Sequence, residues 1–176
     1  DLSEWDVSNG TNFSYMFYEA SEFDQDIGSW DVSNGRNFAE MFSKAEVFNQ
    51  DISSWDVSSG TDFSYMFYET SEFDQDIGSW DVSNGRNFAG MFSNAEVFNQ
   101  DISSWDVSSG TDFTYMFFRA SEFDQDITLW EVGANANLRD MFRGADLMQL
   151  NQQFSSHPKY SEFNKKLPTY SVTLSA

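Results

Sequence analysis

Acidic residues recur along this chain in two rows, each with a spacing of 25 residues. Carboxylate oxygens are hard ligands of the kind that calcium prefers, so the first row is a candidate calcium site. If successive repeats stack at roughly 4.8 Å, like charges face one another, which is destabilising unless something pairs or screens them. Hydrogen bonds from backbone amides at a turn, or solvation and salt, are the alternatives to calcium. The first row comprises Asp26, Asp51, Asp76, Asp101 and Asp126.

The second acidic row and a row of glutamines are expected to face a partner. Residues 1–130 contain 25 Asp or Glu against four Lys or Arg, and the whole chain has a formal net charge of -20. Such a surface suits a basic or cation-bridged partner and disfavours nucleic acid, whose phosphates need cationic contacts. The partner-binding candidates are Asp31, Asp56, Asp81 and Asp106, together with Gln50, Gln75 and Gln100.

The composition offers no catalytic constellation. The only histidine is His157, cysteine is absent, and the acidic residues occupy near-equivalent places in successive repeats. A nucleophilic or acid-base site needs one distinctive environment. We therefore expect a protein that is not an enzyme and has no catalytic residues. It requires no cofactor, and calcium is the ion that its acidic rows suggest. No run approaches about 18 consecutive apolar residues, so we also expect no membrane insertion of this chain.

One period positions all of these residues. Met-Phe pairs and tryptophans both recur at intervals of 25 residues. A period of this length indicates a solenoid, in which each repeat buries its apolar face against its neighbours. We expect residues 1–148 to form the repeat solenoid and residues 149–176 to form an irregular C-terminal cap of the same single domain. The tryptophans are Trp5, Trp30, Trp55, Trp80, Trp105 and Trp130.

Each repeat is expected to contain one helix and one short strand. The spacing i, i+3, i+4 and i+7, which is typical of one helix face, is kept by Phe13, Met16, Phe17 and Ala20. The alternation of apolar and polar residues over 30–33 predicts a strand with Trp30 and Val32 facing inward. The predicted fold class is an α/β solenoid of about six stacked coils, with parallel strands and helices or helical turns behind them.

A longer period overlies the short one. Residues 21–70 and 71–120 are identical except at six positions. Tyr15, Tyr65 and Tyr115 recur only in alternate repeats. Tyrosine combines apolar area with a polar handle, so these residues are candidate recognition anchors. The alternative is that they form a half-buried flank of the core.

The consensus of the repeat resembles a known family. The run Met-Phe-x-x-Ala-x-x-Phe-Asn-Gln-Asp-Ile-Ser-Ser-Trp-Asp-Val-Ser occurs at 41–58 and 91–108. It resembles the BspA-like repeat of bacterial surface proteins, whose members usually carry Val and Met where this chain has Gly35 and Phe38. The resemblance implies a leucine-rich-repeat-like solenoid in an extracellular or cell-surface location, engaged in adhesion or recognition. The family supplies no catalytic residues.

The function that these observations favour is a non-enzymatic, surface-displayed binding or adhesion module. It would present a regular acidic and polar face to a protein or glycan. One alternative is a structural spacer, or a calcium-stabilised scaffold, within a larger surface protein. Another is a lattice surface that binds ice or mineral, which the regular spacing favours.

Overall fold

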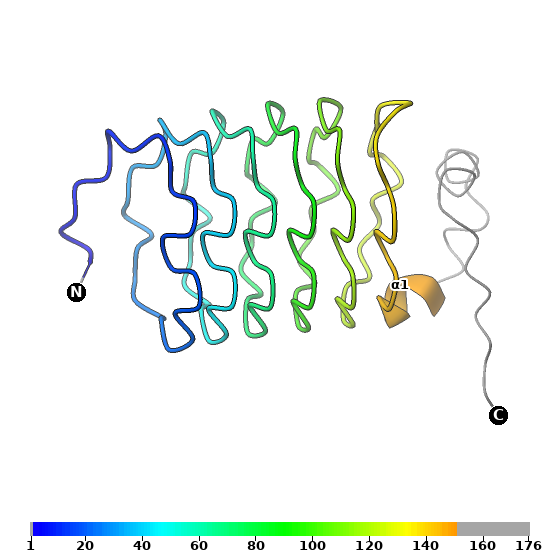
Figure 1. Cartoon of the computed structure of the whole chain (residues 1–176), viewed down its shortest axis with the longest axis horizontal. Helices are drawn as coiled ribbons and strands as arrows, with labels where there is room; N and C mark the ends of the chain where they lie inside the picture. Colours follow the sequence, from blue (N-terminus) through cyan, green and yellow to red (C-terminus); the bar gives the residue numbers. More distant parts are fainter. Residues whose placement is uncertain (1, 151–176) are drawn as a thin grey trace.

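The computed structural model describes residues 2–150, which form a stack of similar coils with the first coil at one end and the helix α1 at the other (Figure 1). Within these residues α1, Asp146–Leu150, is the one α-helix. Extended strands are absent from the same part of the chain. One isolated parallel bridge joins each coil to the next at a single position of the repeat. The bridged residues are Asn12, Asn37, Asp62, Asn87, Asp112 and Asn137.

The prediction of an α/β, leucine-rich-repeat-like solenoid was wrong, because the coils contain neither the expected helix nor the expected strand. The apolar residues of the expected helix face inward in the interior coils, where Met41, Phe42 and Ala45 are fully buried, but in the first coil Met16 is 40% exposed. A chain of tight turns, and not a helix, produces this burial. The four-residue turns return the chain inward at nearly the same interval as a helix, so both give the same sequence pattern.

Left-handed residues explain why no helix forms in this turn segment. Two positions of each coil have φ between 54° and 77°, and most of them are not glycine. A right-handed helix needs a negative φ at every residue, so each such residue interrupts it. The first position is occupied by Tyr15, Glu40, Tyr65, Gly90, Tyr115 and Asp140. The second is occupied by Glu19, Lys44, Glu69, Asn94, Arg119 and Gly144.

Hydrogen bonds between coils replace those of a helix. The N–H groups of Phe63, Tyr65 and Phe67 donate to carbonyl oxygens of the next coil at 2.8–2.9 Å. The intervening N–H groups of Met66 and Tyr68 donate to the carbonyl three residues earlier, at 3.1–3.2 Å. The backbone is thereby satisfied alternately by the neighbouring coil and by the local turn, which is the requirement for a buried main chain.

The expected strand is likewise a pair of turns. The Trp80 N–H donates to the Ile77 carbonyl at 3.1 Å, and the Gly85 N–H donates to the Val82 carbonyl at 2.7 Å. These turns leave no room for a strand between them. The predicted orientation was nevertheless right: Trp80 and Val82 are buried, whereas Asp81 between them is exposed.

The core consists of columns of identical aromatic rings. Phe38 stacks on Phe63 with ring centroids 5.6 Å apart and planes 5° apart, and this contact recurs along the stack. Within one coil, Phe42 stacks on Phe48 at 4.1 Å. Offset stacking of this kind contributes beyond the area that the rings bury. A protein with no cysteine therefore holds its coils together by ring packing and hydrogen bonds.

The buried tryptophans also tie their coils to the preceding ones. The Trp80 Nε1–H donates to the Ile52 carbonyl at 3.1 Å, and Trp55, Trp105 and Trp130 repeat the contact with Ile27, Ile77 and Ile102. Buried indole N–H groups need such a partner, because an unpaired donor in the core is costly.

Two expectations concern the C-terminal part and the membrane. The predicted cap at 149–176, with His157, lies almost wholly outside the described residues. In the described part of the chain, no helix has the length and apolar character needed to cross a membrane.

Candidate functional site

The second acidic row forms an exposed line of carboxylates with one repeated geometry. Each Oδ1 accepts a hydrogen bond of 3.0 Å from the N–H two residues further on. This arrangement is an Asx turn, in which the side chain of Asp fixes the backbone that follows it. Residues 2–150 place no other hydrogen-bond donor on these carboxylates beyond the serine of the turn. The row comprises Asp31, Asp56, Asp81 and Asp106, with Ser33, Ser58, Ser83 and Ser108 as donors.

The first acidic row uses the same turn. Its Oδ1 atoms accept N–H bonds of 2.9–3.0 Å, also from the residue two positions on. Of the three explanations for this row, the structure provides the backbone hydrogen bonds. The part of the chain that is described contains no group of three or more acidic or histidine side chains arranged to hold a metal ion. The row comprises Asp26, Asp51, Asp76, Asp101 and Asp126, and calcium binding there remains a prediction.

Hydrogen bonds of the Asx turn favour the ionised form of three carboxylates in the second acidic row. Hydrogen bonding from the Ser33 side chain, and next from its backbone N–H, lowers the pKa of Asp31. The corresponding serines lower the pKa of Asp81 and Asp106 in the same way. A donor that binds the charged form of a carboxylate stabilises that form.

The glutamine candidates are less available than the aspartates. Gln75 is half-buried and its Nε2 donates to Asn49 Oδ1 at 2.8 Å, while Gln100 Nε2 donates to the Asp74 carbonyl at 3.0 Å. Gln50 is half-buried at the same position of its coil. Gln75 and Gln100 thus make contacts between coils, and their side chains project less into solvent than the aspartates do.

A ladder between coils was missed by sequence reasoning. Asp24 Oδ1 accepts the N–H of Asn49 at 3.0 Å, Asn49 Oδ1 accepts that of Asp74 at 3.1 Å, and the series continues. Asp and Asn alternate along it, so each carboxylate faces a neutral amide and not another charge. That alternation was the signal that could have revealed it. The ladder comprises Asp24, Asn49, Asp74, Asn99 and Asp124.

The tyrosines of alternate coils lie on the turn segment, away from the acidic rows in sequence. The Tyr15 side chain is 56% exposed, whereas Tyr65 and Tyr115 are half-buried. Each makes an edge-to-face contact with the aromatic residue three positions on. The interpretation as a half-buried flank fits Tyr65 and Tyr115, whereas recognition through these rings stays a prediction.

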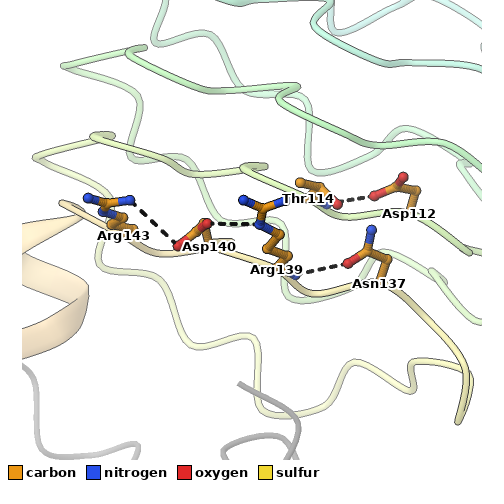
Figure 2. Close-up of polar contacts among 6 residues, drawn as sticks. All are labelled: Asp112, Thr114, Asn137, Arg139, Asp140 and Arg143. Atoms are coloured by element: carbon orange, nitrogen blue, oxygen red, sulfur yellow. Dashed lines mark hydrogen bonds and ion pairs between the residues drawn. The ribbon is translucent and has the colours of Figure 1, made fainter. Parts of the chain in front are cut away.

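Arginines gather at the last described coil, as Figure 2 shows. Asp140 is buried, with Arg139 Nε at 3.3 Å from its Oδ2 and Arg143 Nη1 at 4.0 Å from its Oδ1. The Arg139 N–H donates to Asn137 Oδ1 at 3.2 Å, so the Asx turn of this position continues into the atypical coil. The positive charges of the two arginines offset the free-energy cost of burying the Asp140 carboxylate.

Comparison with known proteins gives a family. The model of the family described as "Mycoplasma protein of unknown function, DUF285" matches residues 1–95 and, in a second overlapping match, residues 61–157. No curated protein and no solved structure gives a match. Two matches to one family model within a single chain agree with the internal repetition of the sequence. The chain belongs to the repeat family described as Mycoplasma protein of unknown function, DUF285.

Proposed function

We propose that this protein is a non-enzymatic binding module whose second acidic row contacts a basic or cation-bridged protein or glycan. The observation that carries the proposal is the repeated Asx turn, which holds Asp31 and its equivalents in one orientation in successive coils. The charges are exposed, evenly spaced and fixed before any partner arrives.

Preorganisation and charge are what make this row suited to binding. A side chain that is already held in place loses less conformational entropy when it binds, so more of the interaction energy appears as affinity. The net charge of -20 attracts basic surfaces over a longer range and raises the association rate. The same charge repels nucleic acid and other polyanions.

We further propose that the module is displayed outside the cell, as in the BspA-like surface repeats that the run at 41–58 resembles. The support for this is the motif itself. Adhesion through many weak, equivalent contacts fits a repeated surface, because linked contacts raise the overall affinity without any single strong site.

Substitution of Asp by Asn tests the charge while keeping the turn. Asn12 and Asn37 already form equivalent turns in this chain, with Oδ1 accepting N–H bonds of 3.0 and 2.9 Å. A combined variant carrying Asp31→Asn, Asp56→Asn, Asp81→Asn and Asp106→Asn should keep the fold. We expect it to bind polylysine and basic extracellular-matrix proteins roughly tenfold more weakly by biolayer interferometry at low ionic strength.

A matched control changes the same number of charges elsewhere. Glu46→Gln, Glu72→Gln, Glu96→Gln and Glu122→Gln alter exposed acids at two other repeat positions. An equal loss of binding affinity in both variants would show that only the net charge matters, and it would contradict the proposal. Unaltered binding in the Asp variant would favour a spacer.

The same binding assays with calcium and with chelator decide whether the partner is cation-bridged. Melting curves under both conditions test the calcium prediction for Asp26 and its equivalents.

A further inference from the structure

One face of the stack carries most of the differences between two otherwise identical units. Residues 21–70 and 71–120 differ at six positions, all within the turn segments. Within the same segments an aromatic pair recurs in every second coil despite these differences. We call it the aromatic face: Tyr15 with Tyr18, Tyr65 with Tyr68, and Tyr115 with Phe118.

Each pair of the aromatic face has the same geometry. The two rings meet edge to face, with centroids 5.7 Å apart in the first pair, 5.8 Å in the second and 5.4 Å in the third. Pairs stand two coils apart, which places them roughly 10 Å from one another if each coil rises by the spacing of paired strands. The face therefore presents equivalent rings at a regular interval along the stack.

The backbone does not require tyrosine at these places. Tyr65 has φ of 54°, a conformation that is costly for a bulky side chain, and Gly90 occupies the same position in the next coil with φ of 62°. A strained residue that the fold could replace by glycine points to a role on the surface. The Tyr65 ring lies over the Gly90 backbone, where a Cβ would come within 2.3 Å of it.

In the coils between the aromatic pairs, the two ring positions are occupied by Glu40 and Ser43 after the first pair and by Gly90 and Ser93 after the second. The Ser43 side chain is only 1% exposed, and its hydroxyl has no hydrogen-bond partner in the described part of the chain. A buried hydroxyl without a partner costs stability, and at 1% exposure the Ser43 side chain is out of reach of a surface ligand.

Carboxylates accompany the rings of the first two pairs, whereas Arg119 and Arg139 lie over the rings of Phe118 and Tyr115 in the third. Tyr18 is hydrogen-bonded to Glu19, Tyr68 to Glu69, and Tyr15 to Glu40 of the following coil. These bonds raise the pKa of each phenol and leave the carboxylates beside exposed ring edges. Ring faces accept C–H groups, carboxylates accept hydrogen bonds from hydroxyls, and phenols donate or accept them.

We propose that the aromatic face binds a neutral linear polysaccharide, of the kind built from β-1,4-linked pyranose units. Such a chain offers apolar C–H faces to aromatic rings and hydroxyls to the flanking carboxylates. It turns over at each linkage, so equivalent faces recur at every second unit, an interval close to the two-coil spacing. A single-stranded nucleic acid also stacks on aromatic rows, but it needs a cationic groove that a chain of net charge -20 does not provide. This proposal concerns other residues than the acidic rows and stands independently of them.

Isothermal titration calorimetry with the soluble hexamers of β-1,4-linked glucose and of β-1,4-linked N-acetylglucosamine tests the proposal. The two probes share the backbone chemistry and separate the two sugars. A hexamer can reach two neighbouring pairs and should bind at least tenfold more tightly than the corresponding dimer. Because no ion pair is involved, the affinity should barely change with ionic strength, unlike that of the acidic row for a basic partner.

The variant Tyr15→Asn, Tyr65→Asn and Tyr115→Asn removes the rings while keeping a residue that tolerates positive φ, as Asn94 does at φ of 57°. It should weaken binding roughly tenfold or more. The Phe variant at the same positions should retain most of the affinity, and the Asp-to-Asn variant of the acidic row should retain all of it. Near-ultraviolet circular dichroism of the buried tryptophans verifies folding. Failure of both hexamers to bind, or equal binding by the Asn variant, would overturn the proposal.

Discussion

The ring of Phe63 occupies the volume that a side chain at Gly60 would need. A Cβ on Gly60 would lie 2.3 Å from Phe63 Cζ and 2.9 Å from the Val57 carbonyl oxygen. The equivalent pairs repeat this contact along the stack, with Cβ to Cζ distances between 2.2 and 2.6 Å. A side chain gained at the glycine position therefore requires a slimmer side chain at the phenylalanine position three residues later.

Gly60→Ala should therefore destabilise the protein by about 1–3 kcal/mol, the usual cost of overpacking a core. Phe63→Met alone should also destabilise it, by leaving a cavity. The double variant should be more stable than the sum of the two single changes predicts. The smaller Met side chain removes the clash with the new Cβ at residue 60, and that Cβ fills part of the cavity left by the ring. Chemical denaturation followed by tryptophan fluorescence measures all three. Strict additivity would show that the two positions are not coupled. Gly133→Ala, where a Cβ meets nothing within 4 Å, is the neutral control.

The indole N–H bonds between coils can be removed singly. Trp80→Phe keeps an aromatic ring in the column but leaves the buried Ile52 carbonyl without its donor, so we expect a loss of about 2–3 kcal/mol in the free energy of unfolding. Trp5 is 54% exposed, and Trp5→Phe should cost less than about 1 kcal/mol. Similar losses at the two sites would contradict the role assigned to the Trp80 hydrogen bond.

The Asp and Asn alternation can be broken by one substitution. Asn49→Asp places three carboxylates in succession on the ladder while keeping the oxygen that accepts the Asp74 N–H. We expect a loss of roughly 0.5–1 kcal/mol from like-charge repulsion. High salt should recover most of it, because screening shortens the range of the repulsion. Asp74→Asn is the converse change and should be neutral or stabilising; a loss that persists in salt would point to hydrogen-bond geometry instead.

The Asx turns make stability depend on pH in acid. The pKa of Asp31 lies below its usual range in the folded protein, so the unfolded chain takes up protons at higher pH than the folded chain does. The stabilisation is complete above the unfolded pKa, near pH 4, and is lost as the pH falls through the folded pKa. Relative to Asp31→Asn, which cannot titrate at this position, the wild-type protein should lose stability as the pH falls below about 4. Denaturation at several pH values measures this difference, and a constant difference would contradict it.

The sequence predicted the buried residues well and the backbone badly. Trp30, Val32, Met41 and Phe42 are inside, as their spacing indicated. Spacing reports which side chains are buried and not which backbone buries them. The left-handed conformation of Tyr65 and Glu69 could not be anticipated, since neither residue favours it.

The clue to the turns lay in single copies of the repeat. Gly90 and Asn94 occupy the left-handed positions in one coil, with φ of 62° and 57°, and both residue types are typical of that region. A comparison of Gly90 and Asn94 with the residues at the same positions of the other coils would have indicated turns. In the candidate site, the Asp-x-Ser pattern was enough to anticipate an Asx turn. The alternating ladder at Asn49 needed the register between coils, which only the structure supplies.

The hydrogen bonds between coils have a direction. In the turn segment the N–H groups of Phe63, Tyr65, Phe67 and Glu69 all point to the next coil. They outnumber bonds of the opposite sense, such as that from the Arg86 N–H back to the Thr61 carbonyl. Peptide dipoles aligned in this way add up, as they do along a helix. The surplus of bonds of one sense gives the backbone of the stack a net dipole, positive toward its higher-numbered coils, that grows with every coil.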